Sequence, residues 1–364
     1  MFLGVPSTIS ESFYHFSAHR AKDFLRLASW LRFLGVASYL AVDVGGTSTR
    51  AVVVDEGGRC RGYGAAGRGN PTAAGAESAA AAIAQAVTDA QAAAEVDGDE
   101  VVAGAAAIAG AGPHVESALR EALAAAGLHV ELSLQPDLLA CFCSGSLADE
   151  GYALVAGTGA IAARVGDGAL VATSDGVGWL LGDAGSGFWI GHRVARAVAA
   201  ALDGRAPPTT LVAAVLADLG IAEDDRRGSQ GRALALGTLV SAVYRMVPVE
   251  LARFARLAFD AAGDGDEVAG GIVDEAGREL ATTVTTIVAP HVTGPVVLGG
   301  SVLARQPTFA AGVVATLRER GVTGPFVTVD DGTVGAAVLA LRLGGVDVAE
   351  ATFERIRTTL AAMR

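Results

Sequence analysis

Two parts of this sequence share one order of apolar runs and glycine turns, and this repeat leaves few folds open to the chain. In the first part, an apolar run at 39–46 ends in two glycines and a threonine, and a second apolar run follows at 50–59. In the second part, the run at 152–165 is divided by a Gly-Thr-Gly turn. Apolar runs separated by glycine turns are typical of β-hairpins. The repeat therefore predicts a duplicated unit.

Further strands and helices follow each hairpin in a similar order. In the first half we expect strands at 59–67, 101–110 and 128–137, and helices at 74–95 and 114–126. In the second half we expect strands at 169–176, 294–304 and 325–332, the middle one running into a helix, and helices at 187–203, 209–218, 230–246, 249–261, 266–290, 333–343 and 347–362. Hairpins followed by alternating helices and strands indicate an α/β fold with two mixed sheets.

The length of 364 residues corresponds to about two domains. We interpret residues 1–36, which are rich in aromatic side chains, as an N-terminal extension; a docking helix at 21–35 is the alternative. The expected domains are a first lobe at 37–144, completed by a helix at 345–364, and a second lobe at 145–344 that carries a helical insertion at 187–290.

Charge and composition exclude several kinds of partner. The net charge of −12 would repel the phosphate backbone of a nucleic acid. No apolar run reaches the roughly 18 residues that a membrane span requires. The three cysteines are too few for a disulfide scaffold or a four-thiolate zinc site, which fits a reducing compartment. We therefore expect a cytoplasmic protein that binds neither nucleic acid nor membrane.

Lysine is almost missing from the chain, which has 27 basic residues and a single lysine, Lys22. A P-loop, a Schiff-base mechanism and the strand lysine of protein kinases are therefore all excluded. Any phosphate must be bound through backbone N–H groups, hydroxyls, arginine or a metal ion.

The two glycine turns are the first candidate binding segments. Glycines in Asp43-Val-Gly-Gly-Thr47 allow the backbone to approach a phosphate closely, and the Asp43 carboxylate is suited to hydrated Mg²⁺. The segment Ala156–Ala160 occupies the matching place in the second half. Each turn could equally be an ordinary hairpin. Across a cleft, the two turns together would hold one polyphosphate from both sides.

Asp137 is the candidate catalytic base. It follows Pro136 at the end of an expected strand, and ligands of open α/β sheets bind beyond the carboxyl ends of the strands. A carboxylate there can take a proton from an alcohol. The alternative is that Asp137 only caps the helix that follows it.

Four segments in order resemble one known family. They are DVGGTSTR at 43–50, LVAGTGAIA at 154–162, DGVGWLLGDAGSGFWIG at 175–191 and VVLGGSVLA at 296–304. Together they resemble the BadF/BadG/BcrA/BcrD-type ATPases, in the N-acetylglucosamine kinase-like branch of the actin, hexokinase and Hsp70 superfamily, and within it the actinobacterial glucosamine kinases. The resemblance covers about 38–364. It implies a two-domain actin-like ATPase fold (ribonuclease H-like), with duplicated mixed sheets and a cleft between the domains.

The resemblance also implies roles for individual residues. Asp137 would position and deprotonate a sugar hydroxyl, and Asp43 would hold Mg²⁺. Contacts to ATP would come from Gly45, Gly46, Thr47, Thr158, Gly159, Gly299, Gly300 and Ser301. Contacts to the sugar would come from Asn70, Asp137, Gly157, Trp179 and Asp183. Asn70 precedes Pro71 and could equally be a turn residue. Trp179 would form a wall under the sugar ring, whereas Trp189 would be a core aromatic.

The implied reaction transfers the γ-phosphoryl group of ATP, with Mg²⁺, to the 6-hydroxyl of glucosamine. N-acetylglucosamine is the alternative substrate, although related N-acetylglucosamine enzymes read Gly-Asp-Glu-Gly-Ser where this chain has Ala184. An iron–sulfur activator ATPase and a sugar sensor are alternatives from other classes. Cys141 and Cys143 are expected to pack in a helix rather than bind a cluster, and a sensor would need a DNA-binding domain that we do not expect here. An apolar surface on the insertion favours a homodimer.

Overall fold

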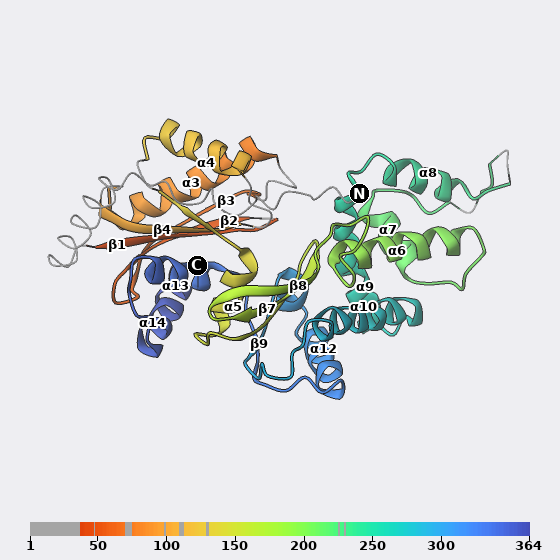
Figure 1. Cartoon of the computed structure of the whole chain (residues 1–364). Coiled ribbons are helices and arrows are strands. Elements are labelled where there is room, and N and C mark those ends of the chain that lie inside the picture. The colour runs from red at the N-terminus through yellow and green to blue at the C-terminus, as the bar shows by residue number, and fades with distance from the viewer. Residues whose placement is uncertain are drawn as a thin grey trace, which may run out of the picture.

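The computed structural model describes residues 37–46, 48–69, 75–97, 100–108, 113–128, 131–224, 226–228 and 231–364 (Figure 1). Thr47, Asn70 and the expected extension at 1–36 lie outside these residues. None of the helices described is long and apolar enough to cross a membrane.

The first sheet has five strands in the order β3-β2-β1-β4-β5. Their bounds are β1 Ser38–Val44, β2 Thr49–Asp55, β3 Cys60–Ala66, β4 Val101–Ile108 and β5 Ser133–Gln135. β2 runs antiparallel to both β1 and β3, while β4 pairs parallel with β1 and β5 parallel with β4. The predicted mixed sheet is confirmed, although β5 is much shorter than the strand expected at 128–137.

The second sheet repeats this arrangement in the order β10-β9-β6-β7-β8. Its strands are β6 Gly151–Ala156, β7 Ala160–Gly166, β8 Ala169–Asp175, β9 Val296–Gly299 and β10 Phe326–Thr328. Again an antiparallel group of three is extended by two parallel strands. The duplicated α/β unit predicted from the glycine turns is therefore confirmed.

Helices cover both faces of the first sheet (Figure 1). On one face lie α3 (Ala76–Ala94) and α4 (Pro113–Ala125), and their apolar side chains form one core with Leu40, Val42 and Val53 of the sheet. On the other face lie α13 (Thr333–Leu343) and α14 (Glu350–Ala361). We expected α13 in the second lobe, within 145–344, but its contacts with strands are to β1, β2 and β4 of the first sheet.

One helix pair joins the two sheets. The helix α5 (Asp137–Gly145) packs on α13 and also contacts β6 and β9 of the second sheet. The two helices approach so closely that a side chain at Gly335 would overlap the backbone of Ala140. Because Leu139 and Phe142 of α5 share a core with α13 and the second sheet, the two halves are packed together through this pair.

The insertion after β8 forms a separate helical core with the second sheet, as Figure 1 shows. Its helices are α6 Gly187–Leu202, α7 Leu211–Asp218, α8 Leu234–Val243, α9 Ala255–Gly263 and α10 Glu267–Thr285; α11 Ser301–Arg305 and α12 Pro307–Glu319 follow β9. The α-helix expected at 249–261 is wrong in its first part, where Pro248–Phe254 forms a 3₁₀-helix. Proline lacks the N–H of an α-helical bond, and the Glu250 side chain accepts the Val247 N–H there.

Candidate active site

The two predicted phosphate loops face each other. The first loop joins β1 to β2 and is closed by the Gly45 N–H, which donates to the Ser48 carbonyl at 3.0 Å. A Cβ atom added at Gly46 would lie 4.0 Å from the hydroxyl oxygen of Thr158 in the second loop. Two segments more than one hundred residues apart therefore meet at one point. Their phosphate contacts stay a prediction.

The second loop is held by α6, the helix that begins within segment 175–191, which we call the sugar-side motif because the family resemblance places it beside the sugar. Its carbonyl at Gly157 accepts the Gly187 N–H at 2.8 Å, and its carbonyl at Thr158 accepts the Phe188 N–H at 3.1 Å. Both donors belong to the first turn of α6, whose N–H groups have no partner within the helix. The loop and α6 are thereby fixed relative to each other.

The third glycine segment lies beside the second loop. A Cβ atom added at Gly157 would lie 3.6 Å from the hydroxyl oxygen of Ser301, the first residue of α11. Gly300 has φ +88°, which side chains rarely adopt, and a Cβ there would lie 2.5 Å from the Ala156 carbonyl. Three of the four predicted segments thus converge where strands of the two sheets end.

Asp43 lies at the end of β1 and is 7% exposed. Its Oδ2 accepts the Gly332 N–H at 3.2 Å and lies 3.5 Å from Nη1 of Arg50. Burial and the neighbouring Asp331 raise the pKa of Asp43 to about 7, and Arg50 opposes this shift. The negative charge of the ionised Asp43 carboxylate, which a metal ion would need, is therefore only partly balanced by the neighbouring protein groups.

Asp331 is a site residue that the sequence interpretation missed. It follows β10, and its carboxylate accepts two hydrogen bonds or ion pairs from Arg364, at 2.9 and 3.0 Å. Nε of Arg50 lies 3.5 Å from the same carboxylate. Burial favours the neutral acid, but Arg364 outweighs it and lowers the pKa of Asp331. The rule that selected Asp137, an acid at the end of a strand, also applies to Asp331.

Asp137 is the first residue of α5, directly after β5. The helix cap is Pro136, and the Asp137 carboxylate instead accepts the N–H of Leu138 at 2.9 Å. The alternative that Asp137 is the helix cap is therefore wrong. Burial raises the pKa of Asp137, and its charge also contributes to the raised pKa of Asp43. The two acids therefore lie close enough to interact.

The sugar-side motif is a loop closed by one carboxylate. Oδ1 of Asp175 accepts the Asp183 N–H at 2.7 Å, and Oδ2 accepts the Ala184 N–H at 2.9 Å. Asp175 and Asp183 both have positive φ, 64° and 57°. The Asp183 carboxylate in turn accepts the Ala160 N–H of the second phosphate loop at 3.2 Å, and burial raises its pKa. Asp175 thus fixes the residue that was predicted to bind sugar.

The two tryptophans near this loop have different surroundings. Trp179 is 41% exposed, and its ring centroid lies 5.6 Å from that of the buried Phe188. Trp189 is half-buried against the helical core, with the Arg193 guanidinium 3.9 Å from its ring centroid. Trp179 therefore presents a ring to solvent beside the sugar-side motif, as a wall for a ligand would. Its role stays a prediction.

The cysteines that an iron–sulfur activator would need are buried in α5. Cys141 and Cys143 both lie in the core between the sheets. Burial raises the pKa of Cys143 to about 11 and raises that of Cys141 as well, so both stay protonated thiols. In the part of the chain that the structure describes, no three His, Cys, Asp or Glu side chains are grouped to hold a metal ion.

The model of one protein family matches residues 40–340, which is most of the chain. This chain belongs to the BadF/BadG/BcrA/BcrD ATPase family. An ATPase of this family binds ATP, so the glycine loops described above belong to an ATP-binding fold. A comparison with curated proteins finds no match.

Solved structures of similar fold include sugar-kinase relatives. A proposed N-acetylglucosamine kinase from Chromobacterium violaceum has a TM-score of 0.64 and 23% identity, covering 84% of this chain and 99% of that one. Another from Porphyromonas gingivalis has a TM-score of 0.64 and 21% identity, with the same coverage. A ROK family glucokinase from Streptomyces griseus, solved with glucose and AMPPNP, has a TM-score of 0.51 and 20% identity, covering 84% and 100%. These likenesses confirm the actin-like ATPase fold.

Proposed function

We propose that this ATPase is an amino-sugar kinase that transfers the γ-phosphoryl group of ATP to the 6-hydroxyl of glucosamine. The observation that carries the proposal is the half-buried carboxylate of Asp137, at the edge of the first sheet where Asp43 and the first phosphate loop also lie. A phosphoryl acceptor needs a base beside the phosphate-binding groups, because its hydroxyl loses a proton during transfer. The raised pKa of Asp137 makes it a stronger base than an exposed aspartate.

Magnesium fits this site through Asp43. Mg²⁺ commonly takes one or two carboxylates and completes its shell with phosphate oxygens and water, so a grouped set of protein ligands is not required. The poorly compensated charge of Asp43 suits a divalent cation, which would favour the ionised carboxylate. When bound, Mg²⁺ would neutralise charge on the transferring phosphoryl group.

Phosphate groups would be bound without lysine. Backbone N–H groups at Gly46 and Gly159, and the hydroxyls of Thr47, Thr158 and Ser301, would supply hydrogen-bond donors, while the Gly45 N–H shapes the loop by its bond to the Ser48 carbonyl. Gly299 and Gly300 would lie under the nucleotide. Packing also requires glycine there, since a Cβ atom at Gly299 would meet Cys141 and one at Gly300 would meet the backbone of Ala156. Catalysis would then depend mainly on positioning and electrostatics.

The sugar would lie beside Asp183, Gly157 and Trp179, with Asn70 as a further contact. Glucosamine carries a protonated amine near neutral pH, and the acids Asp137, Asp175 and Asp183 favour a cation over a neutral amide. N-acetylglucosamine remains the alternative substrate, because Ala184 leaves more space than a glutamate would. The buried thiols of α5 favour a kinase over an iron–sulfur activator.

A coupled assay with purified full-length protein and MgATP tests the proposal. The acceptors are glucose, glucosamine, N-acetylglucosamine and N-acetylmannosamine, each compared by kcat/KM. We expect glucosamine to have the highest value. A higher kcat/KM for N-acetylglucosamine would overturn the charge argument, and sugar-independent ATP hydrolysis alone would overturn the kinase assignment.

We also propose that the protein is cytoplasmic and forms a homodimer. The helical insertion would supply the dimer interface. The apolar side chains of Leu234, Val240, Tyr244 and Val247, on and just after α8, are all at least 40% exposed. Light scattering of the purified protein measures the oligomeric state directly.

A further inference from the structure

Arg364 reaches the active site from beyond the end of α14. Its guanidinium meets the Asp331 carboxylate end-on, with Nη1 2.9 Å from Oδ2 and Nη2 3.0 Å from Oδ1. The guanidinium carbon also lies 5.7 Å from the centroid of the Tyr63 ring on β3. This geometry is the strong, bidentate form of an arginine–carboxylate pair.

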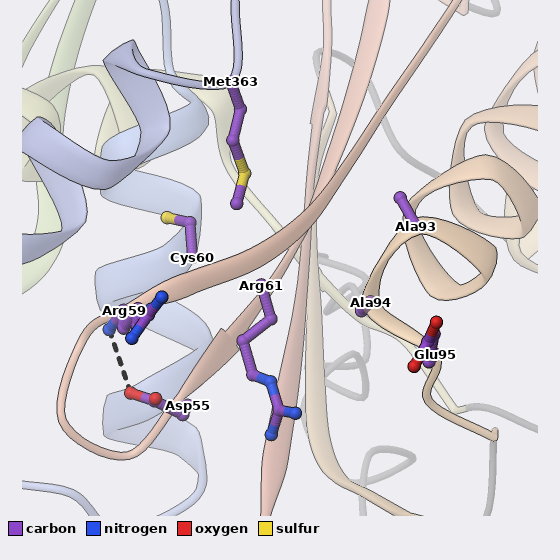
Figure 2. Close-up of a pocket in the computed structure, with 8 residues that line it drawn as sticks. All are labelled: Asp55, Arg59, Cys60, Arg61, Ala93, Ala94, Glu95 and Met363. Carbon is purple, nitrogen blue, oxygen red and sulfur yellow. Dashed lines mark hydrogen bonds between the residues drawn. The ribbon is translucent and has the colours of Figure 1, made fainter.

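The structure holds the base of this side chain firmly. α14 packs on β3 through buried Phe353, Ile356 and Leu360, and the Thr359 hydroxyl accepts the Cys60 N–H at 3.0 Å. Figure 2 shows Met363, which precedes Arg364, reaching over β3 into a cavity of about 440 Å³ that Cys60 also lines. The position of Arg364 is therefore set by packing on the first sheet.

Four charges alternate from Arg364 to the end of β1. Arg364 pairs with Asp331, Asp331 lies 3.5 Å from Nε of Arg50, and Nη1 of Arg50 lies 3.5 Å from Asp43. The Asp331 and Asp43 side chains are each 11% exposed, so these charges are screened little by water. Because Arg364 already neutralises Asp331, Arg50 remains shared between the two acids.

We propose that Asp331 and Arg364 are a positioning pair that keeps Arg50 beside the first phosphate loop, where its charge favours bound ATP. Arg50 ends the segment that contains this loop, and arginine is the cationic side chain available, since the single lysine is Lys22. Without the Arg364 charge, Asp331 draws Arg50 to itself and adds a net negative charge near the phosphates. The inference rests on the proposed function only for the place of ATP.

Two variants separate the charge of Arg364 from its size. Arg364→Gln keeps hydrogen-bond donors on a long side chain but removes the charge. Arg364→Lys keeps the charge but loses the planar guanidinium that makes two parallel hydrogen bonds. Arg357→Ala is the matched control, because Arg357 lies on α14, close to Arg364 in sequence, and pairs with the exposed Glu354. The dissociation constant of MgATP is measured by calorimetry on the full chain, and KM for MgATP and for sugar are measured alongside. A melting curve of each variant verifies folding.

We expect Arg364→Gln to raise the dissociation constant of MgATP about tenfold, since one charge roughly 10 Å away at an effective dielectric of about 20 has that effect. Arg364→Lys should raise it about threefold, and KM for sugar should stay unchanged in both. Three results would overturn the proposed pair. The dissociation constant of MgATP could change less than twofold in Arg364→Gln, or rise equally in Arg364→Lys, or rise equally in the Arg357→Ala control. Wild-type protein that binds MgATP but phosphorylates no sugar overturns the proposed function and leaves this binding test valid.

Discussion

The two glycine loops occupy equivalent places in the two sheets, yet they are built from different interactions. The first loop follows Asp43, whose carboxylate lies in a row of alternating charges with Arg50 and Asp331. The second loop follows Ala156 and is held by hydrogen bonds of its own carbonyls to α6 and by the Asp183 carboxylate. One loop is surrounded by ionic side chains and the other is tied mainly through its backbone.

This difference indicates that the repeat supplies geometry and that the side chains in which its two copies differ supply chemistry. The strand order is the same in both halves, but Asp43 and Asp137 belong to the first half, and Asp331, which follows β10 of the second sheet, lies beside Arg50 of the first sheet. We therefore expect changes on the first side to reduce turnover, and changes on the second side to weaken sugar binding.

The largest effect is expected for Asp137→Asn. The substitution keeps the size of the side chain and its bond to the Leu138 N–H but removes the base, so kcat should fall roughly 10²–10⁴-fold. Steady-state kinetics with glucosamine measures kcat, and calorimetry measures the binding of MgATP. A variant that keeps a tenth of the turnover would show that Asp137 is not the base and would break the contrast between the halves.

The next effect is expected for Asp43→Asn, which retains an acceptor for the Gly332 N–H but loses the charge for Mg²⁺. Turnover should fall about a hundredfold, because a bound metal ion contributes several kcal/mol of charge stabilisation. The activity that remains should need more Mg²⁺ for half-saturation. An unchanged Mg²⁺ titration would exclude Asp43 as the metal ligand.

A smaller effect is expected on the second side for Asp175→Asn. An amide at this position accepts one of the two N–H groups from Asp183 and Ala184 and opposes the other with its own NH₂. The loop should loosen, so that KM for the sugar rises about tenfold while kcat changes little. Asn tolerates the positive φ of this position, so backbone strain is not introduced.

Asp167→Asn is the control for that variant. Asp167 also has positive φ, at 51°, and lies exposed in the turn at the other end of the same β7–β8 hairpin. It should leave both kinetic constants unchanged. If Asp175→Asn lowered kcat and spared KM, the second side would take part in the chemistry and the contrast drawn above would fail.

The sequence was sufficient for features that depend on local pattern. Apolar runs divided by Gly-Thr turns predicted both hairpins, and the strand expected at 128–137 predicted that Asp137 lies at a strand end. Contacts between distant segments could not be predicted this way. Arg364 and Asp331 are 33 residues apart, and Arg50 is far from both, so only the packing of α13 and α14 on the first sheet brings the three together.

The sequence pattern also could not predict the ends of strands and helices that are determined by tertiary contacts. β5 is three residues long, although its alternating apolar pattern starts further back, at Leu128. The helix expected at 249–261 starts as a 3₁₀ turn at Pro248, which then packs Leu251 and Phe254 into the helical core. The packing of α13 on the first sheet, and the close approach of Gly335 to α5, are long-range contacts that have no periodic signal in the sequence.

The smallest effect concerns stability and pH in the absence of Mg²⁺. The pKa of Asp43 is raised from 3.8 to about 7 in the folded state, so its contribution to stability is present at low pH and is lost as the pH rises toward 7. Asn does not titrate, and Asp43→Asn should therefore gain stability relative to the wild type between pH 5 and pH 8, by about 2–4 °C in Tm. Asp183→Asn, from the half-buried acid of the second loop, is the matched comparison and should shift less. Adding Mg²⁺ at pH 8 should stabilise the wild type and leave Asp43→Asn unchanged. A relative Tm of Asp43→Asn that falls as the pH rises would mean that Arg50 compensates the Asp43 charge fully, and the two loops would then be electrostatically alike.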